Sequence, residues 1–227
     1  MKSYGDACGI TRALDVIGDR WALPVVRELV FGPRRYSDLA GALPGVSTNI
    51  LGDRLKHLAA TGVVRKRRLG PPAAATVYEL TSWGAALEPV LIALGAWAAH
   101  TPIELEQQSF SPASFALSLK TTFDAQAAGE AQLHIRFVMH EDAFDVSIER
   151  GTLRVDRMRD LGLAPTPGDE TSTQVHADPK TLAAILYAGV DPAEAVRAGS
   201  ARIEGSPDGV VAFAQCFTLP AAPTEGL

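Results

Sequence analysis

Apolar residues in the first hundred positions recur every three or four residues, which is the spacing of amphipathic helices. A short helix is expected from Ile10 to Val16. Asp19 is the predicted N-cap of a second helix that continues to Val30, where a Gly-Pro pair ends it. A further long helix is expected over residues 81–99, and its apolar stripe either packs on its own domain or forms a dimer interface. The members of that stripe are Leu87, Val90, Leu91, Leu94 and Trp97.

Between these helices the pattern predicts two shorter helices joined by a tight turn. The first covers residues 36–43 and ends at a Pro-Gly pair. The second begins at Ser47, a good N-cap, and ends near Thr61. Its apolar residues fall on one side and predict one buried face, formed by Leu51, Leu55 and Leu58.

A basic hairpin is expected next, with strands at residues 63–69 and 76–80 around a Gly-Pro-Pro turn. The first strand holds four consecutive cations at 65–68, and at most two of them can face one surface because strand side chains alternate. This order is that of a winged helix-turn-helix, whose second helix enters the DNA major groove while the hairpin contacts phosphates. The alternative for the hairpin is a solvated edge strand that its charge protects from pairing.

Double-stranded DNA is therefore the first candidate partner, and paired half-sites predict a homodimer on a palindromic operator. Asn49 is a candidate for base recognition, because amide side chains can pair with adenine edges. The candidate DNA contacts are Arg34, Arg35, Ser47, Thr48, Asn49, Arg54, Lys56, His57, Arg65, Lys66, Arg67 and Arg68.

Charge divides the chain where the motifs do. Residues 1–100 carry a net charge of +4, and residues 101–227 carry −9. A chain of 227 residues is also longer than a typical single domain. We therefore expect a DNA-binding domain at 1–100, a linker at 101–112, a second domain at 113–220 and a disordered tail at 221–227.

The second domain mixes helical and strand patterns. Phe115, Leu119 and Phe123 recur at helical spacing. Asp-Pro pairs at 178–179 and 191–192 each place an N-cap acid before a first-turn proline. The order of elements predicts an α+β fold with helices on one face of a single antiparallel sheet. The expected strands are 133–138, 144–149, 152–155, 171–177 and 201–205, with a loop at 161–170 and a closing helix at 208–217.

Features that the sequence lacks exclude several classes of protein. Cys8 and Cys216 are the only cysteines and lie in different halves, so no disulfide framework is expected. No apolar run could cross a membrane and no signal peptide is evident, which predicts a cytoplasmic protein without a membrane partner. The histidines lack metal-ligand spacing, and neither a phosphate-binding loop nor a nucleophile elbow is found. We therefore expect no enzyme activity, no metal and no cofactor.

Several motifs in residues 4–100 resemble, in the same order, the HxlR family of bacterial transcription regulators. They are Cys8 and the runs 13–21, 29–39, 43–47 and 78–84. The resemblance implies dimeric winged-helix DNA binding, with a recognition helix over about residues 47–61.

The recognition helix departs from the family at Gly52 and Asp53, which replace hydroxyl and amide residues, so the DNA sequence that it reads does not transfer. Asp53 would repel phosphate unless it accepts from a cytosine or pairs with a neighbouring cation. Some members of the family sense oxidants through an N-terminal cysteine that aligns with Cys8, although Gly9 follows it here instead of proline. The alternative is a packed, inert thiol.

Residues 113–218 resemble the sterol carrier protein type-2 family, most clearly in the runs 175–186, 191–195 and 199–205. The resemblance implies an apolar tunnel between sheet and helices that takes sterols, acyl chains or other hydrophobic small molecules. The alternative is a closed domain whose apolar residues fill an ordinary core. The candidate lining residues are Phe115, Leu119, Phe123, Phe137, Phe144, Leu182, Ile185, Leu186, Phe213 and Phe217.

These patterns and resemblances predict a homodimeric transcription regulator that a hydrophobic molecule or lipid controls through the second domain. The alternative is a lipid-binding or transfer protein in which the winged helix domain serves mainly for dimerisation.

Overall fold

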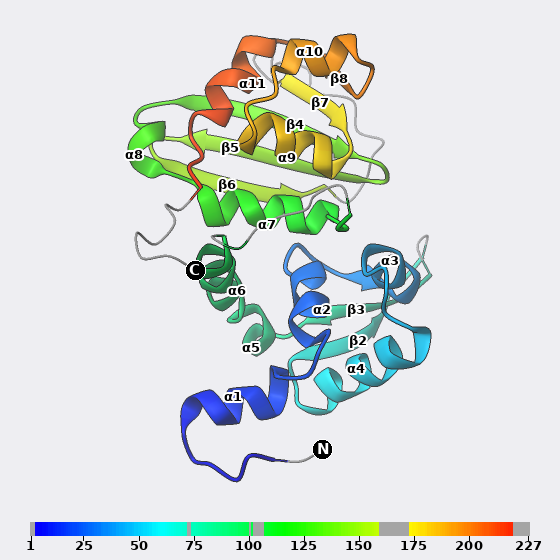
Figure 1. Ribbon diagram of the computed structural model, residues 1–227. Helices are drawn as coiled ribbons and strands as arrows, with labels where there is room; N and C mark the ends of the chain where they lie inside the picture. Colours follow the sequence, from blue (N-terminus) through cyan, green and yellow to red (C-terminus); the bar gives the residue numbers. More distant parts are fainter. Residues whose placement is uncertain (1–2, 72–73, 100, 102–106, 159–172, 220–227) are drawn as a thin grey trace. The chain divides into compact units, whose positions relative to one another are not determined.

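The computed structural model describes residues 3–71, 74–99, 101, 107–158 and 173–219 (Figure 1). The chain divides into two compact units, an N-terminal unit of Met1–Leu91 and a C-terminal unit of Ile92–Leu227. Each unit has its own sheet. No helix among the described residues is long and apolar enough to cross a membrane.

The N-terminal unit packs short helices on a three-stranded sheet of order β1-β3-β2. Its strands are β1 (Arg34–Arg35), β2 (Val64–Arg68) and β3 (Thr76–Leu80). Its helices are α1 (Gly9–Ile17), α2 (Ala22–Leu29), α3 (Tyr36–Ala42), α4 (Thr48–Ala60), α5 (Ser82–Ala85) and the start of α6 (Glu88–Ala98). The core is built from side chains of α2, α3, α4 and the hairpin, among them Val25, Val26, Leu39, Leu51, Leu55, Leu58 and Val77. This confirms the predicted helix-turn-helix and wing and adds β1, which the sequence pattern did not predict.

Two predicted helix boundaries in this unit are wrong, and prolines explain both. The N-cap of α2 is Trp21, not Asp19, and Trp21 has a left-handed backbone with φ of 77°. A helix capped by Asp19 would place Pro24 beyond the first turn, where its ring would clash with the carbonyl of Arg20. Starting at Ala22 keeps Pro24 in the first turn, where its missing N–H costs nothing.

The helix predicted over residues 81–99 is likewise two helices, α5 and α6, which are separated after Ala85. Pro89 cannot donate to the carbonyl of Ala85 and would clash with it in a continuous helix. α5 also packs closely on the start of the wing, because a Cβ at Gly84 would overlap the carbonyl oxygen of Val63. Glycine is therefore required at position 84.

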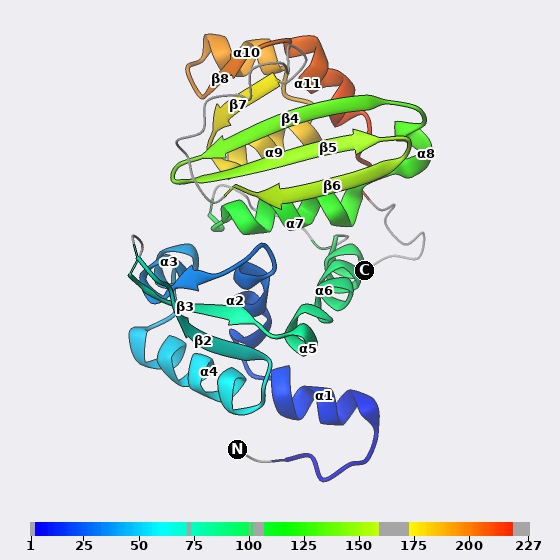
Figure 2. The same ribbon diagram turned by 180° about the vertical axis from the view of Figure 1, so that it is seen from behind.

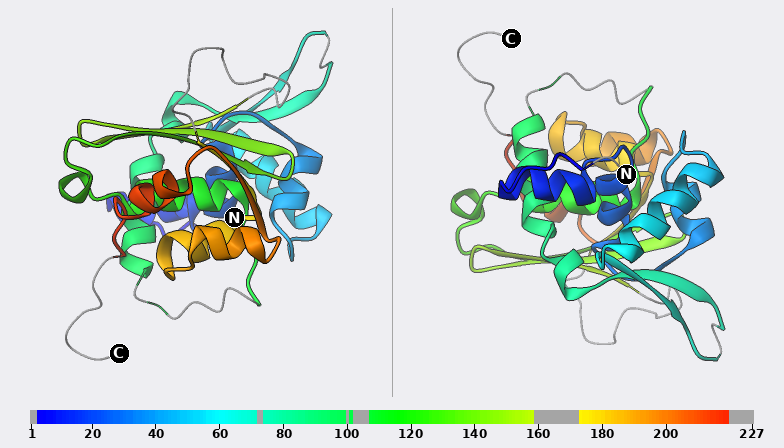
Figure 3. Two further views of the ribbon diagram at one scale, coloured as in Figure 1. Left: turned by 90° about the horizontal axis from the view of Figure 1, so that it is seen from above. Right: turned by 90° about the horizontal axis from the view of Figure 1, so that it is seen from below.

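The C-terminal unit is an α+β layer built on a five-stranded sheet of order β6-β5-β4-β7-β8. The strands are β4 (Gln132–Met139), β5 (Asp142–Glu149), β6 (Thr152–Arg157), β7 (Thr173–Ala177) and β8 (Ala201–Glu204). The helices are α7 (Pro112–Thr122), α8 (Ala125–Ala128), α9 (Pro179–Tyr187), α10 (Pro192–Arg197) and α11 (Pro207–Ala214). α7, α9 and α11 lie on one face of this sheet, and the view from behind shows the other face without a helix (Figures 2 and 3).

The prediction that this sheet is antiparallel is wrong at one pair of strands. β4 and β7 are parallel, with Ile135 opposite Thr173. A period of two is the same in parallel and antiparallel strands, so the alternation in the sequence could not distinguish them. The loop predicted at 161–170 lies outside the described residues, as do residues 102–106 of the predicted linker and the whole predicted tail.

The helix caps of the C-terminal unit follow the sequence closely. The carboxylate of Asp178 accepts from the backbone N–H groups of Lys180 and Thr181, and Asp191 caps α10 in the same way. Both predicted Asp-Pro starts are therefore confirmed. The closing helix ends earlier than predicted, at Ala214, and Phe217 forms an isolated β-bridge with Phe123 instead.

Candidate nucleic-acid interface

The α4 helix is set by its N-cap and by one apolar face. The Ser47 hydroxyl accepts from the backbone N–H of Ile50 at 3.3 Å, which confirms the predicted cap. Tyr36 of α3 donates its hydroxyl to the carbonyl of Thr48 at 2.6 Å and ties the start of α4 to the preceding helix. Because Leu51, Leu55 and Leu58 are buried, the opposite face is the one that can enter a DNA groove.

That outward face carries Asn49, Asp53 and Lys56, all of which are exposed. The ammonium of Lys56 lies 3.6 Å from the carboxylate of Asp53, one turn earlier on the helix. The ammonium of Lys56 therefore offsets the negative charge that Asp53 would otherwise present to a phosphate. Pairing with a neighbouring cation was one of the two ways, predicted from the sequence, in which Asp53 could avoid repelling phosphate. Asn49 lies one turn before Asp53 on the same face, and it is the amide that this face offers for base recognition.

The side chains of two other candidates on α4 point toward α1 and the residues that follow it instead of outward. Arg54 forms an ion pair with Asp19, and only 14% of its side chain is exposed. The Nε2 atom of His57 lies 3.0 Å from the carbonyl oxygen of Val16. Arg54 and His57 therefore hold the N-terminal segment against α4 in this structure, and they are less available to DNA than the sequence suggested.

The four cations of the wing lie on two different faces. Arg65 and Arg67 both reach Glu79 on the neighbouring strand: the Nε of Arg65 donates at 2.7 Å, and that of Arg67 donates to both oxygens at 3.0 Å. Lys66 lies over the ring of Tyr78, 6.0 Å from its centroid. The predicted alternation is confirmed, and the charge of one face of the wing is partly neutralised by the carboxylate of Glu79.

Glu79 was not among the residues singled out from the sequence. The hydrogen bond from Arg67 holds the pKa of its carboxyl below the usual value, although burial acts in the opposite direction. The hairpin register places Glu79 directly opposite Arg65, so an explicit strand pairing could have found it. The side chain of Arg68 forms no ion pair with a described residue, and it is exposed on the same face as Lys66.

The remaining candidates lie at the start of the helix-turn-helix. Arg34 and Arg35 form β1 and pair with Tyr78 and Val77 of the wing. The backbone N–H of Arg35 donates to Asp38 at 3.0 Å, which fixes the start of α3. Arg35 is exposed, whereas Arg34 is half-buried.

The Cys8 thiol lies at the N-terminus of α1, on an exposed residue. Hydrogen bonds from the backbone N–H groups of Ile10 and Thr11 lower its pKa. Cys216, in contrast, is buried, and burial raises the pKa of its thiol. Among the residues that the structure describes, no group of three His, Cys, Asp or Glu side chains could hold a metal ion.

The ten candidate ligand-lining residues come together on the inner face of the C-terminal sheet. Nine are buried, and Phe123 is half-buried. The ring of Phe137 packs edge-on against Phe115, with centroids 5.2 Å apart, and also lies 5.5 Å from Phe213. These aromatic side chains therefore fill the layer between sheet and helices.

One groove reaches this apolar layer from outside. It has a volume of about 400 Å³ and runs between α9 and α11, beside Ile185 and Leu186. Val190 and Val211 also line it, so its wall is largely apolar.

The sequence of the N-terminal part matches known proteins. A model of the HxlR-like helix-turn-helix family matches residues 16–105. The uncharacterized HTH-type transcriptional regulator YvaP of Bacillus subtilis is 36% identical over 87 residues, which are 38% of this chain and 81% of the relative. The chain belongs to the HxlR-like helix-turn-helix family. The regulator YodB of the same organism is 31% identical over 86 residues, 38% of this chain and 77% of that one.

The reduced form of YodB, a solved structure, has a TM-score of 0.38 to this chain at 29% identity, covering 42% of this chain and 95% of the regulator. The HxlR-like part of the chain is a winged helix-turn-helix, and HxlR-type proteins are DNA-binding transcription regulators, typically dimeric. Its relatives are regulators rather than enzymes, and this does not favour a lipid carrier that only dimerises through the winged helix. The family match ends at residue 105 and leaves nearly all of the C-terminal unit outside it.

Proposed function

We propose that this regulator reads a palindromic operator as a homodimer and that a hydrophobic small molecule held in the C-terminal unit changes its affinity for DNA. The observation that carries the DNA-reading part is the outward face of α4 beside a wing with an unneutralised cationic face. The observation that supports the ligand is the apolar layer between the C-terminal sheet and its helices.

The DNA contacts are proposed to differ in kind. Asn49 reads bases, because it is an exposed amide on the outward face of α4. Lys66 and Arg68 contact phosphates, since their face of the wing has no carboxylate partner among the described residues. Arg65 and Arg67 already form ion pairs with Glu79, which holds the two guanidinium groups in place and offsets part of their charge.

The dimer is proposed to form through α6. Val90, Leu94 and Trp97 recur at helical spacing on one face, and they are 43%, 42% and 76% exposed. Exposed apolar residues of this size on one helix face mark an interaction surface. A second copy of the chain is the partner that a two-fold operator requires.

The ligand is proposed to occupy the apolar layer, as the resemblance to sterol carrier protein type-2 implies. It would enter from the groove beside Ile185 and Leu186 and displace part of the aromatic cluster around Phe137. If the bound ligand changes the affinity for operator DNA by some factor, linkage requires that operator DNA change the affinity for the ligand by the same factor. That factor is ordinarily about 5- to 150-fold.

The two halves of this proposal have separate tests. Genome-wide footprinting of the full chain should find a two-fold symmetric sequence, and its absence would contradict operator reading. Mass spectrometry of the denatured protein should reveal a co-purified hydrophobic molecule. Calorimetric titration of that molecule with and without operator duplex should give different affinities, and equal affinities would contradict ligand control while leaving DNA reading intact.

A second candidate signal is oxidation of Cys8. Its exposure and the lowered pKa of its thiol favour reaction with oxidants at the N-terminus of α1. Mild peroxide should then modify Cys8 before the buried Cys216 and change operator affinity, and the Cys8→Ser variant should not respond. An equal response of both proteins would eliminate Cys8 as the sensor.

A further inference from the structure

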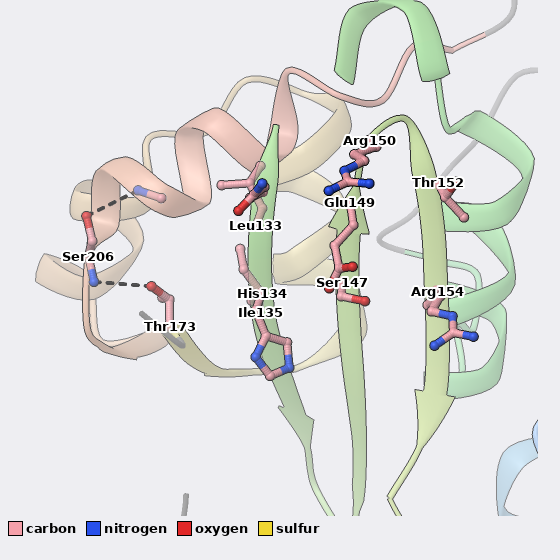
Figure 4. Close-up of a pocket in the computed structure, with 12 residues that line it drawn as sticks. Leu133, His134, Ile135, Ser147, Glu149, Arg150, Thr152, Arg154, Thr173 and Ser206 are labelled. Carbon is pink, nitrogen blue, oxygen red and sulfur yellow. Dashed lines mark hydrogen bonds between the residues drawn. The ribbon is translucent and has the colours of Figure 1, made fainter. Parts of the chain in front are cut away.

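A second groove, larger in volume, opens on the polar outer face of the C-terminal sheet, and its lining also includes Leu133 and Ile135 of β4. Its volume is about 930 Å³, and it lies over the Gln132 end of β4 and the turn between β5 and β6 (Figure 4). Its far wall is formed by Thr173 at the start of β7 and by Ser206 and Gly209 of the α11 start. The backbone N–H of Ser206 donates to the Thr173 hydroxyl at 3.3 Å and holds that wall together.

Three neighbouring strands contribute one polar side chain each to a row across this groove. His134 lies opposite Ser147, and Ser147 lies opposite Arg154. Figure 4 shows the three side chains on the same face of the sheet. Adjacent strands are about 4.8 Å apart, so the row spans roughly 10 Å, which suits a molecule of several heavy atoms better than a single ion.

The charges of this groove differ from those on the rest of the outer face. Outside the groove the face neutralises itself: Asp145 accepts from Arg136, and Arg202 lies 2.6 Å from Glu204. At the edge of the groove, His134 is paired with the same carboxylate of Asp145, 2.9 Å away. Such pairs leave little charge for a ligand.

In the groove, Arg150 and Arg154 are exposed and make no ion pair with any described residue. Glu149 is the single carboxylate among the lining residues. Hydroxyl and amide groups complete the set of hydrogen-bond donors, namely Ser147, Thr152 and Gln132. Guanidinium groups beside hydroxyl donors are the groups that proteins use to bind carboxylates and phosphates.

We propose that this outer-face groove is a binding site for a small molecule that carries an oxyanion, either a carboxylate or a phosphate. Arg154 is assigned to the oxyanion, with the hydroxyl of Ser147 donating beside it. The site lies on the opposite face of the sheet from the proposed hydrophobic ligand. It does not depend on that ligand or on DNA binding.

The experiment is a titration of the isotope-labelled full chain with citrate and, separately, with glycerol 3-phosphate. Amide resonances of residues 147–154 should shift with at least one probe, and which probe binds more tightly distinguishes a carboxylate from a phosphate ligand. Arg154→Gln and Ser147→Ala should each weaken the preferred probe, the former by about tenfold or more because a charge-assisted hydrogen bond is lost. Glu149→Gln should strengthen it.

Arg202→Gln is the matched control, because Arg202 is an exposed arginine on the same outer face that is already paired with Glu204. It should leave binding unchanged. Shifts confined to other residues, or equal weakening by Arg154→Gln and Arg202→Gln, would overturn the proposal. So would the failure of both probes to move any resonance of residues 147–154. Since Arg154 and Ser147 lie on the solvent side of the sheet, unchanged thermal unfolding should accompany both variants.

Discussion

The two units differ in where their informative side chains lie. In the N-terminal unit these are surface cations, and their orientation is fixed by carboxylates such as Glu79 and Asp19. In the C-terminal unit they are buried aromatic rings, fixed by one another. One unit therefore depends on the balance of charge at its surface, and the other depends on the filling of space in its interior. Substitutions should separate these two dependences.

The largest effect is expected in the C-terminal interior. Phe213 is fully buried, 4.7 Å from the ring of Phe217, so Phe213→Ala should cost about 3–5 kcal/mol of unfolding free energy. Denaturant unfolding measures this loss, and Val211→Ala, on the exposed side of the same helix, is the control. A loss below about 1 kcal/mol would show that space beside Phe213 is already open, which would favour the ligand tunnel.

A smaller effect, of about 1–3 kcal/mol of discrimination between bases, is expected from Asn49→Ala. The variant should bind the operator less selectively, while its affinity for unrelated duplexes should change little. Competition binding with operators altered at single positions measures this. Uniform weakening on every duplex would show that Asn49 does not read bases.

Replacing both Lys66 and Arg68 by Ala should weaken binding to all duplexes alike. Each phosphate contact contributes roughly one unit to the slope of log affinity against log salt, so that slope should become shallower by about two. Fluorescence anisotropy over a range of salt concentrations provides the slope. A slope unchanged from that of the original protein would remove this face of the wing from the interface.

The smallest effect on DNA is expected from Glu79→Gln, which keeps the side chain's shape and removes its charge. Arg65 and Arg67 would then lack their counter-charge, so DNA affinity should rise and the salt slope should become steeper by up to about one. Weaker DNA binding by this variant would show that Glu79 acts mainly by orienting the two guanidinium groups.

The same variant gives a pH test of the fold. Because the pKa of Glu79 is lowered in the folded protein, its stabilising effect is present above the ordinary carboxyl pKa and is lost as the pH falls through the lowered value. The original protein should therefore lose more stability than Glu79→Gln between neutral and strongly acidic pH. Parallel loss in both proteins would mean that the ion pairs of Glu79 contribute no net stability.

Much of this architecture could be predicted from periodicity and caps, as α4 and the two Asp-Pro helix starts illustrate. The error at α2 came from keeping Asp19 as the N-cap although Pro24 is tolerated only in a helix that begins near Trp21. The error at the α5–α6 break came from reading apolar spacing without considering what Pro89 does to the preceding turn. Both could have been avoided with the sequence alone.

Other features could not be predicted, because they depend on residues that are distant in sequence. The pairing of Arg54 with Asp19 joins α4 to the segment between α1 and α2, and neither residue's neighbours indicate it. The parallel register of β4 and β7 has no local signal either. The outer-face groove combines residues of four strands with the start of α11, and polar alternation by itself only predicts a solvated face.

The parallel pairing of β4 with β7 has a consequence for the order of folding. β4, β5 and β6 are joined by tight turns and can form early, whereas Ile135 and Thr173 are about forty residues apart and must close a long loop first. Non-local contacts of this kind slow folding. In pulsed hydrogen exchange, the amides of β7 and β8 should therefore acquire protection after those of the β4–β5 hairpin, leaving the edge of β4 transiently open to pairing with another chain.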